Sequence, residues 1–98
     1  MKKNKINKIK TPIVEVLKNH KIRKAGIFGS YARGEEKENS DIDVLIDVGG
    51  RKFSLLDLIS LEMELEKRLG KKIYLLTYAW INSNLKKYIL KDEVRIIW

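Results

Sequence analysis

The segment at residues 42–48 (IDVLIDV) constrains the fold of this chain more than any other. It is short, rich in Val, Ile and Leu, and stops at Gly49 and Gly50, which together indicate a largely buried β-strand. A buried strand must pair its backbone groups with neighbouring strands and must be covered by other elements. The rest of the chain must therefore supply neighbouring strands and covering helices.

The rest of the chain supplies such elements in a regular order. Thr11 and Pro12 are typical N-cap and first-turn residues, and Ser54 with Asp57 is the capping pattern of a longer helix that stops before Gly70. We expect helices at residues 12–20, 54–69 and 82–91, a helical turn at 30–34, and strands at 22–29, 42–48, 72–77 and 94–98. This order predicts an α/β (α+β) domain, with helices packed on a small mixed sheet.

The domain organisation follows from length and charge. A chain of 98 residues forms one domain with one core. Residues 1–10 carry five lysines and are expected to be a basic, solvated and partly disordered N-terminal segment, which leaves residues 11–98 as the single domain. The apolar spacing predicts these core-facing residues in the later elements: Leu55, Leu58, Ile59, Leu61, Leu65, Leu69, Leu85, Tyr88 and Ile89. Trp98 is expected in the core if its strand pairs with the sheet.

The composition excludes several classes of protein. The absence of cysteine rules out disulfides, thiolate zinc sites and cysteine nucleophiles, and it favours a reducing compartment. No apolar run approaches the roughly 20 residues that span a bilayer, and no signal-peptide core is present, so we expect a cytoplasmic protein without a membrane partner. The net charge of +8 permits contact with nucleic acid, but much of it lies in residues 1–10, so this partner is not favoured.

Two carboxylates, Asp41 and Asp43, mark the start of the buried strand. Residues two apart in a strand point to the same face, about 7 Å apart along the backbone, so the two side chains can converge on one metal site. Oxygen ligands without a nearby His or Cys favour Mg²⁺ or Mn²⁺ over zinc. Asp47 shares this face but lies towards the far end of the strand, so we do not expect it to be a ligand.

Gly29 and Ser30 follow the preceding strand and open the helical turn. Glycine allows a phosphate to approach the backbone, and the free N–H groups and the serine hydroxyl can donate hydrogen bonds to it. A phosphate held there would lie between these donors and a metal on the two aspartates.

The combined motif consists of Gly29 and Ser30, ten further residues, and Asp41-Ile42-Asp43. It resembles the G-S-x10-D-x-D signature of the minimal nucleotidyltransferases, a branch of the DNA polymerase β-like superfamily. The resemblance covers essentially the whole chain. It implies a polymerase β-like fold and transfer of AMP from ATP to an acceptor hydroxyl. It also implies two Mg²⁺ ions (or Mn²⁺) held by Asp41 and Asp43, with Gly29, Ser30 and Arg33 on the triphosphate.

The smaller members of this family look like antitoxins that attach AMP to HEPN-type toxins, so the resemblance implies a protein adenylyltransferase with such a toxin as its partner. The family usually places a third carboxylate on the next strand, where this chain has Tyr74. Tyrosine is a poor substitute for a carboxylate as a metal ligand or base. Two alternatives stay open: a nucleotide-binding antitoxin that acts by contact alone, and an RNA-binding accessory protein suggested by the N-terminal lysines.

Overall fold

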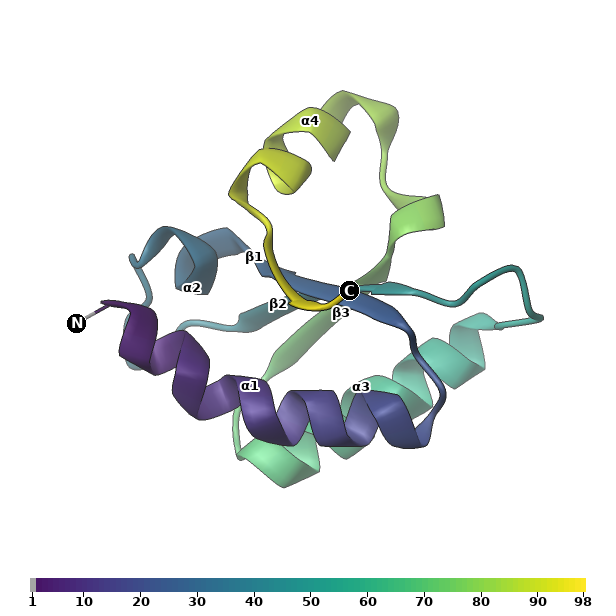
Figure 1. The fold of residues 1–98 in the computed structure, drawn as a ribbon, viewed down its shortest axis with the longest axis horizontal. Helices are drawn as coiled ribbons and strands as arrows, with labels where there is room; N and C mark the ends of the chain where they lie inside the picture. The colour runs from purple at the N-terminus through teal and green to yellow at the C-terminus, as the bar shows by residue number, and fades with distance from the viewer. Residues whose placement is uncertain (1) are drawn as a thin grey trace.

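The computed structural model describes residues 2–98, with side chains described from Ile6 onward (Figure 1). The elements are α1 (Lys2–Asn19), β1 (Lys24–Phe28), α2 (Gly29–Arg33), β2 (Ile42–Asp47), α3 (Leu55–Leu69), β3 (Ile73–Thr77), a 3₁₀ turn η1 (Tyr78–Trp80), α4 (Ser83–Asp92) and β4 (Val94–Ile97). The strands form one mixed sheet in the order β3-β2-β1-β4. Strand β1 is antiparallel to β2 and β4, and β2 is parallel to β3. The predicted α/β (α+β) class is confirmed.

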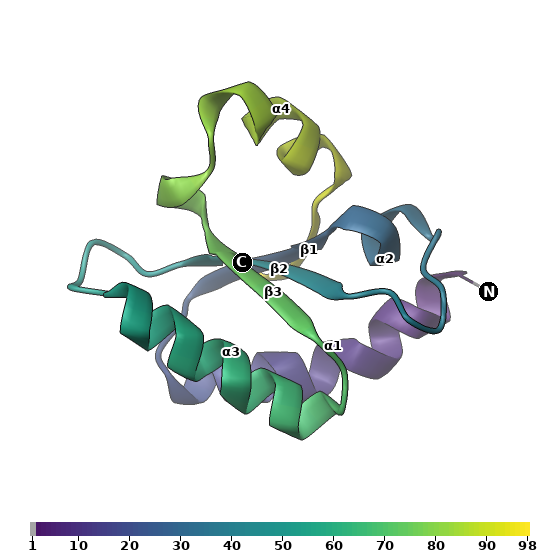
Figure 2. The same cartoon turned by 180° about the vertical axis from the view of Figure 1, so that it is seen from behind.

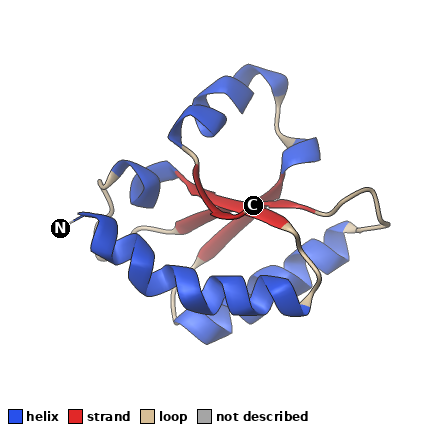
Figure 3. Cartoon of the chain, viewed as in Figure 1, coloured by secondary structure: helices blue, strands red, loops and turns tan. Residues whose placement is uncertain are grey.

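Helices α1 and α3 lie side by side on one face of the sheet, and α4 arches over the other face (Figures 1 and 2). The same layers are seen when helices and strands are coloured separately (Figure 3). Ile42, Val44 and Ile46 of β2 pack into the main core with α1 and α3, whereas Leu45 packs on the α4 side with Phe28 and Ile81. Asp43 and Asp47 are each two residues from Leu45, so their side chains lie on the same face of the sheet as Leu45, the face that α4 covers.

Helix α1 departs most from the sequence prediction, because it begins at Lys2 and carries Pro12 inside it. The expected start at Thr11 and Pro12 is wrong. Ile9 and Ile13 are buried, and Ile6 packs against the same core. Burial of an isoleucine contributes about 1.5–3 kcal/mol, so these residues together offset the roughly 3 kcal/mol cost of an internal proline.

The two ends of α3 are where the sequence places them. The Ser54 hydroxyl accepts from the Asp57 backbone N–H, and the Asp57 carboxylate accepts from the Ser54 N–H, which is the predicted capping box. Gly70 closes the helix in the left-handed conformation. The first and second turns of α3 differ from the prediction: Leu55 and Ile59 are exposed, because the helix meets the sheet and α1 through a narrow stripe formed by Leu58, Leu61 and Leu65.

Three further residues expected in the core lie elsewhere. Leu85 and Tyr88 of α4 are exposed, whereas Ile89 packs against the cluster around Leu45 as predicted. Trp98 is 87% exposed because strand pairing ends at Ile97. Within residues 2–98, no helix has the length and apolar character needed to cross a membrane.

Strand β3 forms one edge of the sheet, and α3 covers its free backbone donors. The Glu62 carboxylate accepts from the Leu75 N–H at 2.9 Å, and the Glu66 carboxylate accepts from the Ile73 N–H at 3.1 Å. These bonds satisfy edge groups that could otherwise pair with another chain.

Candidate active site

The candidate site is centred on Asp43, which occupies the middle of a row across three strands. Asp43 pairs with Phe28, the last residue of β1, and with Tyr74 of β3. Paired residues point to the same side of a sheet, so all three side chains stand on the α4 face. The Phe28 and Tyr74 rings meet edge to face, with centroids 6.5 Å apart and an interplanar angle of 66°. Two aromatic rings therefore border the Asp43 carboxylate.

Gly29 brings the start of α2 directly against this carboxylate. Its φ angle is +74°, and a Cβ at this position would overlap the Asp43 carboxylate and lie 2.9 Å from its Cγ. Only glycine accommodates both the left-handed conformation and the close approach. The structure thus joins the two halves of the predicted motif, Gly29-Ser30 and Asp41-Ile42-Asp43, at one point. No side chain caps the N-terminus of α2.

The electrostatics at Asp43 favour a bound cation. The pKa of Asp43 is raised from 3.8 to about 6, mainly by burial and secondly by the neighbouring charge of Asp41, whereas Arg33 opposes the shift. A carboxylate that is partly removed from water beside another carboxylate is destabilised unless positive charge is supplied. Asp41 itself is exposed at the mouth of the site.

The donor set fits a hard divalent ion that is held partly by its substrate. In residues 2–98 no cluster of three or more His, Cys, Asp or Glu side chains could enclose a metal. A metal on Asp41 and Asp43 would take its remaining ligands from phosphate oxygens and water, which is how Mg²⁺ commonly binds. Whether the two aspartates hold such an ion stays a prediction.

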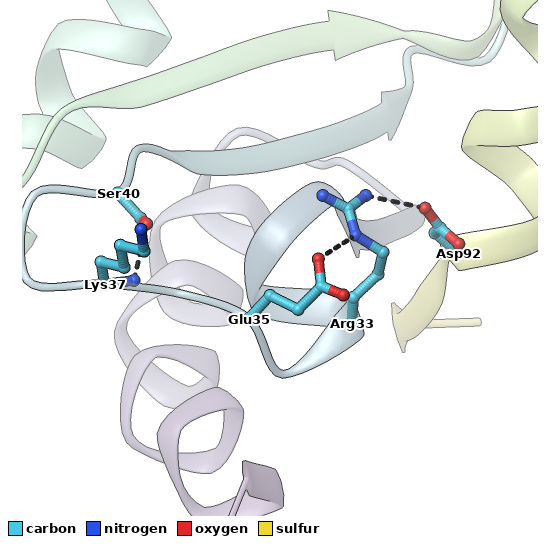
Figure 4. A network of polar contacts seen from close by, with 5 residues as sticks. All are labelled: Arg33, Glu35, Lys37, Ser40 and Asp92. Carbon is cyan, nitrogen blue, oxygen red and sulfur yellow. Dashed lines mark hydrogen bonds and ion pairs between the residues drawn. The ribbon is translucent and has the colours of Figure 1, made fainter.

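Arg33 is engaged within the protein (Figure 4). Its Nε donates to Glu35 at 2.8 Å, and its Nη1 donates to Asp92 of α4 at 2.9 Å. Both hydrogen bonds raise the pKa of Arg33, and the bond to Glu35 has the larger effect. The pairing ties α2 to α4, and a contact between Arg33 and a triphosphate stays a prediction. Nearby, the Lys37 N–H donates to the Ser40 hydroxyl at 2.7 Å and shapes the loop before Asp41.

Tyr74 stands at the β3 position that pairs with Asp43, where the family resemblance implies a third carboxylate. Its side chain is half exposed. The register thus places a phenol beside Asp43, and Asp47 lies at the far end of β2, paired with Lys24.

A second polar cluster on the same face escaped the sequence analysis. The Glu93 carboxylate, whose side chain is 7% exposed, accepts from Arg95 Nε at 3.0 Å and from the Tyr78 hydroxyl. Burial and the bond to Glu93 raise the pKa of Tyr78. The Glu93 side chain lies directly against Gly26, where any Cβ would overlap it. Gly26 could have predicted this contact from the sequence, because a glycine inside a strand often marks a place where another group approaches the backbone closely.

Comparison with known proteins places this site in a family. The model of the family described as "Polymerase beta, Nucleotidyltransferase" matches residues 11–98. The chain belongs to this nucleotidyltransferase family. A solved structure described as a putative minimal nucleotidyltransferase superposes with a TM-score of 0.71 at 27% identity, over 93% of this chain and 92% of the other. The predicted polymerase β-like fold and the family resemblance are confirmed.

The similar nucleotidyltransferases carry more specific names. "Putative protein adenylyltransferase MJ0435" of Methanocaldococcus jannaschii is 50% identical over 92 residues, covering 94% of this chain and 98% of the relative. Protein adenylyltransferase MntA of Thermococcus cleftensis is 41% identical over 75 residues, covering 76% of this chain and 75% of the relative. A toxin-antitoxin crystal structure with AMP-PNP has a TM-score of 0.81 at 21% identity, covering 91% of this chain and 72% of the other, and so supports the fold.

Proposed function

We propose that this nucleotidyltransferase is an Mg²⁺-dependent protein adenylyltransferase that moves AMP from ATP to a hydroxyl group of a HEPN-type toxin and acts as its antitoxin in the cytoplasm. The observation that carries the proposal is the close approach of Gly29 to the Asp43 carboxylate, which brings together the turn proposed to bind phosphate and the carboxylate proposed to bind metal. The protein adenylyltransferases at 50% and 41% identity support the class of acceptor.

The proposed roles follow from position. Asp41 and Asp43 hold the metal ions, of which two are expected. Gly29 and Ser30 hold the triphosphate, with Arg33 adding positive charge. When bound, the Mg²⁺ ions would stabilise the attacking and leaving oxygens of an in-line displacement. In the reaction the acceptor hydroxyl loses its proton to solvent and its oxygen forms a bond to the α-phosphorus. The bond from the α-phosphorus to the oxygen that bridges it to the β-phosphate breaks, and pyrophosphate leaves.

The site gives the proposed acceptor an open approach. Asp41 is exposed and Tyr74 is half exposed, so the mouth of the site can meet the surface of another macromolecule. A small-molecule acceptor would instead need a pocket that buries most of it. This favours an acceptor that brings its own binding surface.

Tyr74 supports a second candidate function, in which the protein binds Mg²⁺-ATP and restrains the toxin by contact without transfer. A phenol with a pKa near 10 cannot replace a carboxylate base efficiently at neutral pH. Under this alternative the nucleotide stabilises the surface that the toxin recognises.

The test is incubation of the purified protein with α-labelled ATP, Mg²⁺ and the product of the neighbouring reading frame. We expect label on the partner protein that protease removes and ribonuclease does not. Asp43→Asn should abolish labelling because it removes a metal-binding charge, whereas Asp47→Asn, on the same face and strand, should leave it intact. Mg²⁺-ATP binding without labelling would refute transfer and leave the contact mechanism, and labelling that survives Asp43→Asn would refute the assigned site.

A further inference from the structure

A basic cleft lies at the end of the sheet remote from Asp43. It is open, has a volume of about 670 Å³, and is formed where the end of α1 meets the end of β4. Lys18, Lys21 and Arg23 supply its charge, Ile22 and Ile97 are apolar lining residues, and Trp98 forms one wall. In Figure 1 the turn from α1 to β1 lies at the right of the sheet, whereas α2 and the candidate active site lie at the left.

The positive charge of this cleft is not neutralised within the protein. Among the described residues, none of the three cations makes an ion pair or a side-chain hydrogen bond. A second hollow of about 310 Å³ shares Lys21 and Arg23 and adds Arg51. The described residues that line the two hollows include no Asp or Glu. A continuous basic strip therefore crosses this end of the molecule.

Lys21 occupies its place in the cleft at a cost in stability. It has a φ angle of +63° and is the one residue other than glycine, within residues 2–98, with a positive φ. The Ile22 N–H bonds to the Leu17 carbonyl, and the Lys21 N–H bonds to the Lys18 carbonyl, which defines a helix end that usually takes glycine. The corresponding positions after α2 and α3 are Gly34 and Gly70.

A lysine at this helix end needs an explanation beyond the fold. The helix dipole favours a cation near the end of α1, but Lys18 already supplies one in the last turn. A strained residue that the surrounding fold does not require is a sign of function. At this position the lysine contributes its ammonium group to both hollows, which glycine could not.

Trp98 adds an aromatic surface to the charge. Its side chain is 87% exposed, and the Arg95 guanidinium lies 5.5 Å from the centre of its indole ring. Arg95 is paired with Glu93, but Lys18, Lys21 and Arg23 line the same cleft as Trp98 without an ion pair to any described residue. An exposed indole together with such cations is the combination that binds unpaired bases by stacking and phosphates by charge. An acidic peptide would use the cations but not the indole, and a duplex would present no free base to stack.

We propose that this cleft binds single-stranded nucleic acid, with a base stacked on Trp98 and the phosphates along Lys18, Lys21, Arg23 and Arg51. The cleft shares no residue with the candidate active site, so a failure to detect AMP transfer would not refute this proposal. It differs from the earlier hypothesis of RNA binding by residues 1–10, because only Lys18 and later residues carry it.

The experiment measures the fluorescence anisotropy of a labelled single-stranded RNA of about ten nucleotides over a series of salt concentrations. Lys21→Gln should weaken binding by about threefold to tenfold and reduce the salt slope by about 0.7. Lys67→Gln, which removes the same charge from exposed α3, is the matched control and should change little. Trp98→Ala should weaken binding by about tenfold, while Trp80→Ala should not.

Lys21→Gly separates function from folding. It should weaken RNA binding as much as Lys21→Gln does, yet raise the Tm by about 2–6 °C, because glycine relieves the left-handed strain. The proposal is overturned if RNA fails to bind at low salt, or if Lys67→Gln weakens binding as much as Lys21→Gln. It is also overturned if polyglutamate competes as well as RNA while Trp98→Ala has no effect, since that result defines a site for an acidic peptide.

Discussion

Replacement of Gly29 by alanine tests whether the contact between α2 and Asp43 organises the site. The residue has a φ angle of +74°, and its new Cβ would lie 2.9 Å from Cγ of Asp43 and overlap the carboxylate. The fold can accommodate this methyl group only if the Asp43 side chain rotates away from the start of α2. The substitution therefore disturbs stability and site geometry together.

Gly70→Ala is the matched control, because Gly70 has a φ of +67° but nothing within 4 Å of an added Cβ. It should cost about 1 kcal/mol from left-handed strain, after allowing for the smaller conformational freedom of the unfolded alanine chain. Gly29→Ala should cost about 2 kcal/mol, since an Asp43 side chain forced off its rotamer adds about 1 kcal/mol to the left-handed strain. For a domain of this size, each kcal/mol lowers the Tm by about 4–8 °C.

Two assays test the predicted effects of Gly29→Ala on stability and on AMP transfer. Thermal unfolding should show a larger Tm decrease for Gly29→Ala than for Gly70→Ala. Transfer of labelled AMP to the partner should fall by about 10²-fold for Gly29→Ala, because a displacement of about 1 Å at a reacting centre costs this much. Equal Tm decreases, or full transfer by Gly29→Ala at a temperature where it is folded, would refute the idea that this contact positions Asp43.

Three further predictions concern neighbouring residues. Tyr74→Asp should raise the rate of AMP transfer by about 10²-fold if a third carboxylate is what the site lacks, whereas Tyr74→Phe should not. Because the pKa of Asp43 is raised to about 6, its ionisation destabilises the metal-free fold as pH rises from about 4 to 6. Asp43→Asn should therefore remove a penalty of about 1 kcal/mol at pH 7, after allowing for solvent screening, in urea unfolding without Mg²⁺. Glu62→Ala should cost about 1 kcal/mol and speed hydrogen exchange at the Leu75 amide, whereas Glu62→Gln keeps an acceptor and should be nearly neutral.

The positions of most elements could be predicted because local signals determine them. The Ser54 and Asp57 capping box fixes the start of α3, and Gly70 fixes its end, through bonds made within a few residues. Pro12 misled the prediction because a proline signals a helix start only where the preceding residues have no core to join. Ile9 joins the core, and so the helix extends through the proline.

The site could be predicted only in part. Period-two alternation puts Asp41 and Asp43 on one face of a strand, and this required no knowledge of the fold. The approach of Gly29 to Asp43 depends on the antiparallel pairing of β1 with β2, which local patterns do not specify. The engagement of Arg33 by Asp92 depends on where α4 returns to the sheet, and no spacing in the sequence encodes it.

The number of helices on each face explains both the wrong core predictions and the accessibility of the site. Four strands at about 4.8 Å spacing are about as wide as two helices of about 10 Å diameter, so α1 and α3 together cover one face. Their outer sides remain in solvent, which is why Leu55 and Ile59 are exposed although their spacing is amphipathic. The other face has α4 as its one long helix among the described residues, and a single helix covers only part of that width. The uncovered part includes the half-exposed Tyr74 beside Asp43. The single helix on this face therefore leaves the candidate active site accessible to the macromolecular acceptor that we propose.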